Sequence, residues 1–146
     1  LILPTSAFYL GIKTRKNILF VILKDQNKIE KNIKKVLSTG CTVTFTALQI
    51  AAYLNPKNIG IVGVDHSFEV KKGPQVQKFK GDDINHFSKD YFKNQYWGLP
   101  DLKGSEKLYQ ISKEYFDSIQ VPIIDYTNNG KLEVFNKGNI QEIIKN

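Results

Sequence analysis

The sequence is poor in several residues on which whole protein classes depend. It has one cysteine, Cys41, two histidines and no methionine, and Arg15 is the only arginine among its 21 basic residues. A lone cysteine cannot form an internal disulfide, which favours a reducing compartment, and so few cysteines and histidines argue against a structural zinc site. Nucleic-acid binders usually contact phosphates and bases through arginine, so a nucleic-acid partner is disfavoured.

Long apolar runs are missing too. The longest one near the start, residues 18–23, has the length of a strand and falls far short of the roughly 18 residues of a membrane helix. The chain opens on Leu1 and contains no methionine, so we expect it to be a piece of a longer protein. No signal peptide is recognisable. We expect a cytoplasmic location, and attachment to the inner face of a membrane stays open as an alternative.

Three common sequence motifs are absent as well. The glycines lack the spacing of a P-loop, and no complete dinucleotide-binding fingerprint is present. No G-x-S-x-G elbow occurs, which excludes an α/β-hydrolase.

The net charge of +7 comes almost entirely from lysine. The lysines are densest at residues 28–35, with a smaller group at 71–80. An anionic small substrate or a membrane surface would explain this charge, and so would ordinary solvation. We interpret residues 26–37 as a basic amphipathic helix, with Gly40 in the left-handed position that follows it.

Elsewhere the pattern alternates between strands and helices. We predict strands at 18–23, 59–64 and 121–126, and helices from Thr42 or Thr44 to about Leu54, at 103–118 and at 140–144. Such alternation is typical of a parallel sheet covered on both faces. The 146 residues therefore predict a single α/β domain, a Rossmann-like three-layer α/β/α arrangement with a mostly parallel sheet. The aperiodic segment 68–100 is expected to form a long lid loop.

Two candidate binding elements lie in this pattern. Thr42, Val43 and Thr44 begin a helix, where main-chain amides and hydroxyls can hold phosphate; the alternative is an ordinary helix cap. Gly63, Val64, Asp65, His66 and Ser67 follow a strand, and the carboxyl ends of strands hold ligands in open α/β sheets. There Asp65 could bind a ribose or base and His66 could carry a proton; the alternative is a turn with a surface histidine.

A third candidate lies in the expected lid. His86 stands among carboxylates that include Asp82, Asp83 and Asp90, and Tyr91 follows. A histidine in such surroundings suits a general base. The alternative is a polar loop anchored in the core by its aromatic residues. The paired Asp82 and Asp83 could recruit Mg²⁺ weakly.

Together these motifs resemble a bacterial and archaeal family of uncharacterised Rossmann-like proteins. That family is described as hydroxymethylpterin diphosphokinase-like and is often encoded with surface-glycan genes. The resemblance runs through residues 42–54, 59–66 and 85–92, the helix around Tyr109, and residues 130–135, and so covers roughly residues 40–136.

The same segments are similar, more distantly, to bacterial CMP-sialic-acid-dependent sialyltransferases. The resemblance implies that the turn at 42–44 faces a nucleotide phosphate and that residues 63–65 line the nucleoside. Asp90 falls where those enzymes have a catalytic histidine, and Ser67 falls where they have a tyrosine that serves the leaving group. Their Gly-rich loop, typically G-x-G-P-S, has no counterpart, which predicts that the chain is the C-terminal part of such a domain.

The function implied is transfer of a sugar from a nucleotide donor to a surface-glycan or small-molecule acceptor. His86 or Asp90 would deprotonate the acceptor hydroxyl, and Tyr91 or Tyr96 would steady the leaving phosphate. No metal or other cofactor is required by these residues. Two alternatives stay open: a pterin-type diphosphokinase, which would need Mg²⁺, and a non-catalytic nucleotide-binding or scaffold domain whose basic segment 26–37 meets a membrane or partner.

Overall fold

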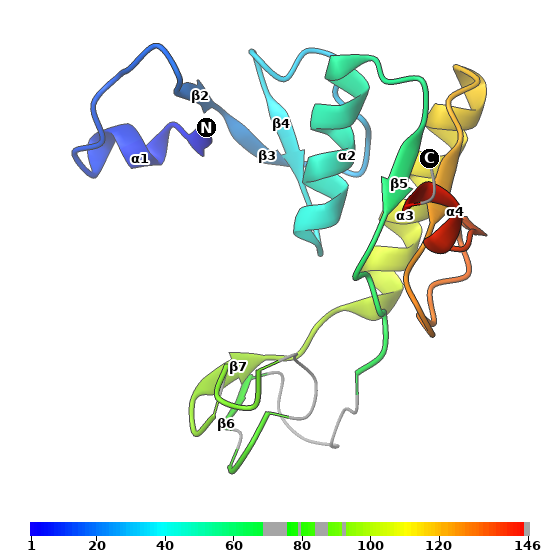
Figure 1. Ribbon diagram of the computed structural model, residues 1–146. Helices are drawn as coiled ribbons and strands as arrows, with labels where there is room; N and C mark the ends of the chain where they lie inside the picture. Colours follow the sequence, from blue (N-terminus) through cyan, green and yellow to red (C-terminus); the bar gives the residue numbers. More distant parts are fainter. Residues whose placement is uncertain (69–75, 79, 84–87, 92, 145–146) are drawn as a thin grey trace.

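The computed structural model describes residues 1–68, 76–78, 80–83, 88–91 and 93–144. The fold is mixed α/β, and its short strands form several small sheets in which most pairs are parallel (Figure 1). The strands are β1 (Ile2–Pro4), β2 (Leu19–Val21), β3 (Leu23–Asp25), β4 (Leu37–Thr39), β5 (Ile59–Ile61), β6 (Val76–Lys78), β7 (Tyr96–Gly98), β8 (Ile123–Asp125) and β9 (Asn136–Lys137). The helices are α1 (Ser6–Tyr9), α2 (Val43–Leu54), α3 (Leu102–Ser118) and α4 (Gln141–Ile144).

The first part of the chain makes two parallel strand pairs, β1 with β2 and β3 with β4. Only Ile22 separates β2 from β3, and its carbonyl accepts a hydrogen bond from the Leu37 amide at 2.8 Å. The predicted strand at 18–23 therefore exists as two consecutive short strands. Val21, Ile33 and Leu37 form a small buried cluster beneath them.

The main core lies between α2, α3 and the parallel sheet β5-β8-β9. Helix α3 supplies Leu108, Tyr109, Ser112 and Phe116 to its buried face, which is the i, i+4 spacing of an amphipathic helix. The main core cluster comprises Leu48, Ile61, Tyr109, Phe116, Val121, Ile123, Leu132 and Phe135. The predicted helices at 42–54 and 103–118 and the α/β class are thus confirmed.

The side chain of Gln49 explains why β4 is an edge strand, with β3 as its partner on one side. The Ser38 N–H donates to Gln49 Oε1 at 3.0 Å, and Gln49 Nε2 donates to the Ser38 carbonyl at 2.8 Å. Both atoms belong to the edge of β4 that would otherwise pair with another strand. Because the amide is fully buried and satisfies both groups, β4 needs no further neighbour.

The predicted helix at 26–37 is wrong. These residues form turns and extended chain that lead into β4. Asn32 gives the physical reason, because its side chain accepts from the Lys34 N–H at 3.2 Å and its carbonyl accepts from the Lys35 N–H at 3.0 Å. Such local bonds offer the backbone an alternative to a helix.

Gly40 is not a helix cap either. It follows β4, and its φ does not lie in the left-handed region. A Cβ there would lie 2.3 Å from Leu108 Cδ1, so a side chain at this position would have to displace the buried Leu108.

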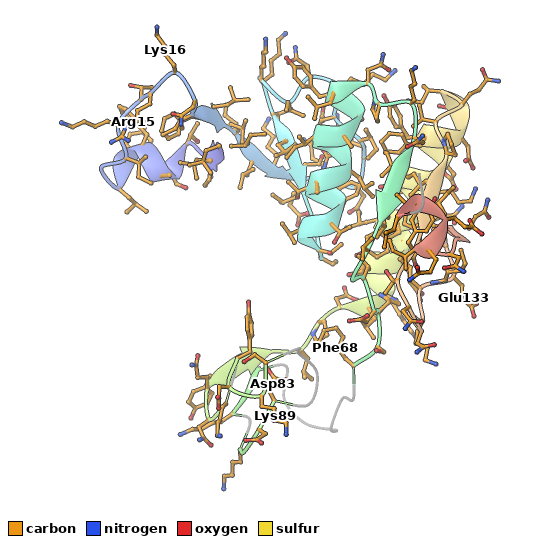
Figure 2. The ribbon with its side chains drawn as sticks, in the orientation of Figure 1. Arg15, Lys16, Phe68, Asp83, Lys89 and Glu133 are labelled. Atoms are coloured by element: carbon orange, nitrogen blue, oxygen red, sulfur yellow. The ribbon has the colours of Figure 1, made fainter. Side chains whose placement is uncertain are left out.

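Strands β6 and β7, between β5 and α3 in the chain, lie away from the main core (Figure 1). They pair antiparallel, so this stretch holds secondary structure that the aperiodic sequence did not predict. Figure 2 shows Phe68 where the chain leaves the core, and Asp83 and Lys89 in the extended part. No helix among the described residues is long and apolar enough to cross a bilayer.

Candidate functional site

A cavity of about 480 Å³ lies where the N-terminus of α2 meets the loop after β5. The residues that line it are Cys41, Thr42, Thr44, Gly63, Val64, Asp65, His66, Ser67, Phe68, Pro100, Leu102, Ser105 and Tyr109. The structure therefore brings together the helix-start and strand-end candidates. Tyr109 and the other α3 residues were not singled out in the sequence, because their spacing is simply that of a helix packed on a core.

Thr42 caps α2 and borders the cavity. Its backbone is extended (φ −147°, ψ 140°), and its Oγ1 accepts from the Thr44 N–H at 3.2 Å. The same oxygen lies 3.2 Å from the Tyr109 hydroxyl, which ties the cap to α3. No acidic residue occupies the first turn of α2. The positive end of the helix dipole is therefore not offset within the helix itself.

Val43 does not share this cavity. Its side chain is 81% exposed, and it lines a smaller apolar cavity of about 260 Å³ on the side of α2 that faces β1 and β2. The difference follows from helix geometry, because successive residues point about 100° apart. Thr44, the next residue along the helix, lines the candidate cavity.

The loop after β5 turns sharply beside the cavity. Gly63 (φ +78°) and His66 (φ +50°) both lie in the left-handed region, which glycine adopts freely and histidine adopts at some cost. Asp65 between them is exposed to solvent. Gly60, in β5 itself, faces the ring of Tyr126, whose Cε2 would lie 3.4 Å from an added Cβ.

The side chain of His66 is largely buried and has a defined partner. Its side chain is 7% exposed, and Nε2 lies 3.0 Å from Glu106 Oε1 on α3. A carboxylate can only accept, so the ring nitrogen is the donor in this contact. The imidazole also meets the Tyr109 ring edge-on, with centroids 6.2 Å apart. Glu106 thus fixes the orientation of the ring at the cavity wall.

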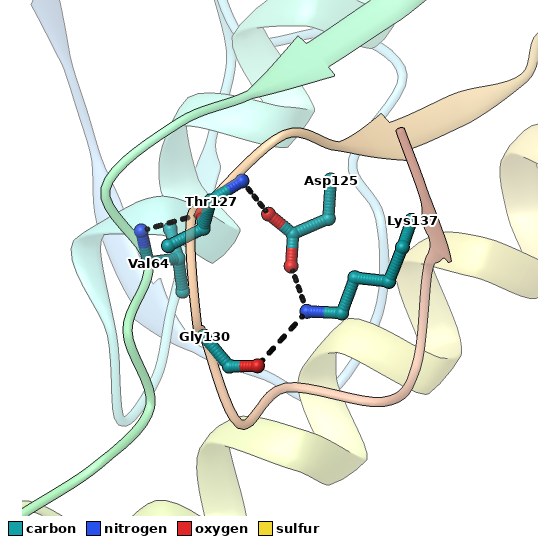
Figure 3. Close-up of polar contacts among 5 residues, drawn as sticks. All are labelled: Val64, Asp125, Thr127, Gly130 and Lys137. Carbon is teal, nitrogen blue, oxygen red and sulfur yellow. Dashed lines mark hydrogen bonds and ion pairs between the residues drawn. The ribbon is translucent and has the colours of Figure 1, made fainter. Parts of the chain in front are cut away.

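A buried network behind the loop holds it in place (Figure 3). The Val64 N–H donates to Thr127 Oγ1 at 3.1 Å, and the Thr127 N–H donates to Asp125 Oδ1 at 2.8 Å. Lys137 Nζ donates to Asp125 Oδ2 at 2.7 Å and to the Gly130 carbonyl at 3.3 Å. The loop after β5 is therefore attached to β8, β9 and the turn after β8.

Asp125 carries the negative charge of this network, opposite Lys137. Burial alone would raise the pKa of its carboxyl, but the hydrogen bonds from Lys137 and Thr127 outweigh it and hold the pKa below its usual value. Asp125 is fully buried, and its place in the sequence pattern indicated only the end of a strand. A carboxylate at the carboxyl end of a buried strand, with a lysine 12 residues on, was the available signal.

Cys41 lies at the rim beside Asp101. Its Sγ is 3.4 Å from Asp101 Oδ2, and the same carboxylate accepts from the Gly104 N–H at 2.8 Å as the cap of α3. Burial and the hydrogen bond to Asp101 raise the pKa of the Cys41 thiol. The bond from Gly104 and that from Cys41 lower the pKa of Asp101. Cys41 is thus a poor nucleophile, because the thiolate is the reactive form.

The described candidate catalytic residues of the expected lid do not lie in the cavity that the other candidates line. His86 lies outside the described residues. Asp90 forms an ion pair with Lys93 at 3.2 Å, and Tyr91 is 51% exposed. Neither of these two lines the candidate cavity. Tyr96, on β7, has Lys78 Nζ 5.8 Å from its ring centroid.

The two candidate Mg²⁺ ligands differ in their surroundings. Asp82 pairs with Lys93 at 2.9 Å, whereas Asp83 is buried and its N–H donates to the Lys89 carbonyl at 2.8 Å. Within the described part of the chain, no three side chains of the types His, Cys, Asp and Glu gather as they would around a metal ion.

A larger cavity of about 580 Å³ lies at the carboxyl ends of β8 and β9. Its lysine, Lys137, is held by Asp125 and the Gly130 carbonyl, and the Asn139 side chain accepts from the Gln141 N–H at 3.0 Å. The 480 Å³ cavity is the better candidate, because it combines the N-terminus of the long helix α2 with the Asp65 carboxylate and the oriented ring of His66.

No family model, no curated protein and no solved structure matches this chain.

Proposed function

We propose that this chain is a Rossmann-like nucleotide-binding domain that holds a nucleotide-sugar donor in the 480 Å³ cavity and transfers its sugar to a glycan or small-molecule acceptor. In this proposal the small sheets are parts of a three-layer α/β/α arrangement, and the domain works in the cytoplasm. One observation carries the proposal: the N-terminus of α2 and the carboxyl end of β5 open into the same cavity.

The phosphate would lie at the N-terminus of α2. The first amides of a helix have no partner within it, and the helix dipole favours an anion there. The Thr42 hydroxyl is already used by the Thr44 amide and Tyr109. Thr44, which also lines the cavity, therefore supplies the side-chain hydroxyl for the phosphate.

The nucleoside would lie against the loop after β5. Asp65 offers an exposed carboxylate that can accept hydrogen bonds from ribose hydroxyls or a base amine. Val64, Phe68 and Leu102 supply apolar wall for the flat base. The cavity volume of about 480 Å³ falls within the range of roughly 300–1,000 Å³ of small-molecule sites.

The transfer step would use the residues of the extended segment. His86 or Asp90 would take the proton of the acceptor hydroxyl, and Tyr91 or Tyr96 would donate to the leaving phosphate. Transfer by these residues would need no metal ion. A pterin-type diphosphokinase, in contrast, would need Mg²⁺ beside the phosphates.

A second candidate function is nucleotide binding without transfer. It is favoured by one specific observation, namely that Asp90 is paired with Lys93 and lies outside the lining of the cavity. In this case the domain senses a nucleotide or presents it to a partner, and the cavity itself is the same.

Binding is tested by calorimetric titration of CMP-, UDP- and GDP-sugars into the chain, with and without Mg²⁺. Replacing Thr44 by Val, or Asp65 by Asn, should weaken donor binding by about tenfold or more, because each removes a hydrogen bond to the ligand. Thr46→Val is the matched control, since Thr46 is on the same helix but lines the apolar cavity of about 260 Å³. Absence of binding by every donor, or equal loss in the control, would refute the proposal.

Transfer is tested separately, by release of free nucleotide in the presence of acceptor sugars. Release that is lost in His86→Ala and Asp90→Asn supports sugar transfer. Tight donor binding without any release supports the non-catalytic alternative. Activity that depends strictly on Mg²⁺ and ATP supports the diphosphokinase.

A further inference from the structure

The end of α1 and the loop after it form a surface with a composition of its own, which we call the 8–16 surface. It consists of four large apolar side chains and three cations: Phe8, Tyr9, Leu10, Ile12, Lys13, Arg15 and Lys16. Figure 1 shows α1 and this loop at one extremity of the molecule, away from α2 and α3. In Figure 2, the labelled side chains of Arg15 and Lys16 extend outward from the loop.

The apolar members are exposed to an unusual degree. The exposed fractions are 52% for Phe8, 86% for Tyr9, 85% for Leu10 and 41% for Ile12. Single exposed apolar residues are normal, but four large ones within five consecutive positions of the chain mark an interaction site. Tyrosine suits a site of this kind, because its ring prefers the boundary between water and an apolar phase.

The charge of this region has one sign. The first acidic residue of the chain is Asp25, so residues 1–24 hold only basic charges. The ion pairs found among the described residues include none to Lys13, Arg15 or Lys16. The only arginine of the chain is therefore part of an unneutralised basic cluster next to the exposed apolar side chains.

The loop is held in this conformation by the fold. The Thr5 N–H donates to the Val21 carbonyl at 2.9 Å, and the Ile12 N–H donates to the Ala7 carbonyl at 3.2 Å. The ring of Phe8 meets that of Phe20 edge-on, with centroids 5.8 Å apart. Gly11 (φ +92°) provides the turn between Leu10 and Ile12. Their exposure is thus a property of the folded chain.

We propose that the 8–16 surface docks the protein on a bilayer that contains anionic lipids. The apolar side chains would enter the boundary between headgroups and acyl chains, and the three cations would contact the lipid phosphates. A position at one extremity lets the surface meet a plane without a clash from α2 or α3. This proposal is independent of the nucleotide site.

Two other occupants fit the surface less well. A nucleic acid would meet the cations but leave Leu10 and Ile12 against a polar backbone. A second copy of the chain, docked symmetrically, would place two basic clusters in one interface, because such interfaces use the same patch on both sides and this patch has no acidic residue to pair with them. An anionic bilayer satisfies both the apolar and the basic members.

The lysine-rich segment at 26–37 is a weaker candidate for membrane contact. Lys28 pairs with Glu30 at 2.8 Å. Lys31 and Lys34 each lie 5.8 Å from the centroid of a tyrosine ring, on α3 and α2 respectively. These three cations already have partners within the protein.

The experiment is sedimentation of the chain with vesicles of phosphatidylcholine alone or of phosphatidylcholine mixed with phosphatidylglycerol. Changing Lys13, Arg15 and Lys16 together to Gln should lower the partition coefficient on anionic vesicles on the order of a hundredfold, since each cation near the surface contributes roughly fivefold. The matched control changes the exposed α3 and loop residues Lys57, Lys103 and Lys107 to Gln and leaves binding within about twofold, because distant charges are screened.

The apolar contribution is tested with Tyr9→Ser and Leu10→Ser, which should also release the protein from anionic vesicles. Leu54→Ser and Ile144→Ser are the controls, because these side chains are 70% exposed at other places. Insertion is read from an environment-sensitive dye on Leu10→Cys in a Cys41→Ser background. Its emission should shift to the blue on anionic vesicles, whereas the same dye on Leu54→Cys should not change.

Three results would overturn the proposal. One is equal sedimentation of the wild type and the Gln variant with anionic vesicles. Another is an equal loss of binding in the control variants. The third is a concentration-dependent dimer in light scattering that Leu10→Ser abolishes, with no vesicle binding by the monomer, which would assign the surface to a second copy.

Discussion

Asp125 offers the sharpest test of how the candidate site is held in place. Its Oδ1 accepts from the Thr127 N–H at 2.8 Å and its Oδ2 accepts from Lys137 Nζ at 2.7 Å. Changing Asp125 to Asn keeps the shape and the first acceptor, but it places a neutral amide opposite the lysine. The same change weakens the support of the Val64 amide, which donates to Thr127.

The expected cost follows from burial. Breaking a fully buried ion pair costs roughly 3–5 kcal/mol. Asp125 is fully buried, but the Lys137 side chain is 43% exposed and keeps its bond to the Gly130 carbonyl. The lysine can recover solvation, so we expect Asp125→Asn to lower the free energy of unfolding by about 2–3 kcal/mol.

The pH dependence has a definite sign. The pKa of Asp125 is lower in the folded protein than its usual value. The folded state thus binds fewer protons than the unfolded state, and the stability from the ionised carboxylate is complete above the unfolded pKa of about 3.9. It is lost as the pH falls through the folded pKa. The wild type should lose this stability in acid, and Asp125→Asn should not show that part of the loss.

Urea unfolding followed by circular dichroism at a series of pH values measures both effects. Lys137→Met is the informative partner, because it removes the cation that offsets burial and should flatten or reverse the acid slope. Asp117→Asn is the control, since its pair with Lys113 is exposed and worth about 0.3–0.5 kcal/mol. Faster hydrogen exchange of the Val64 amide in Asp125→Asn would show that the loop has loosened. A variant as stable as the wild type with an unchanged pH profile would refute the reasoning.

Three further substitutions test the local arguments by urea unfolding. Thr42→Ala removes the α2 cap and should cost about 1 kcal/mol; no loss would mean that the cap contributes nothing. Gln49→Leu removes the partner of the Ser38 N–H and leaves the Ser38 carbonyl only the 3.4 Å bond from Thr46 Oγ1, which should cost about 2–5 kcal/mol, and a stable variant would show that β4 has another neighbour. Gly138→Ala places a Cβ 2.3 Å from Tyr126 Cε1 and should cost about 1–3 kcal/mol; a neutral result would mean that the ring moves freely.

The two long helices could be predicted from the periodicity of the sequence. The pattern predicted α2 and α3 because each carries its stop and start signals within its own sequence: Thr42 before α2, and the pair Asn55 and Pro56 after it. Asn55 takes the left-handed conformation (φ +51°) that ends the helix. For these elements the local chemistry and the tertiary packing favour the same structure.

Residues 26–37 show where periodicity misleads. Ile29, Ile33, Val36 and Leu37 have helical spacing, yet only Ile33 and Leu37 are fully buried, in a cluster with Val21. The Glu30 N–H donates to the side chain of Gln49 at 3.3 Å, which draws this segment alongside α2. A partner 19 residues away cannot be seen in a local pattern.

The candidate site divides in the same way. The residues at the start of α2 and the end of β5 were predicted as binding elements from their positions relative to a helix and a strand, and they line one cavity. Val43 faces elsewhere, and Asp90 and Tyr91 lie outside the lining. His86 is beyond the described residues.

Side-chain chemistry and the periods of helix and strand were thus enough to predict the α/β class, the two long helices and most of the residues around the cavity. Long-range contacts alone decided the rest. Gln49 on α2 bonds to the free edge of β4, and Glu106 on α3 orients the ring of His66. The pair of Asp125 and Lys137 supports the loop after β5. The physical reason is that these bonds join groups distant along the chain, so they form only when packing has brought the elements together.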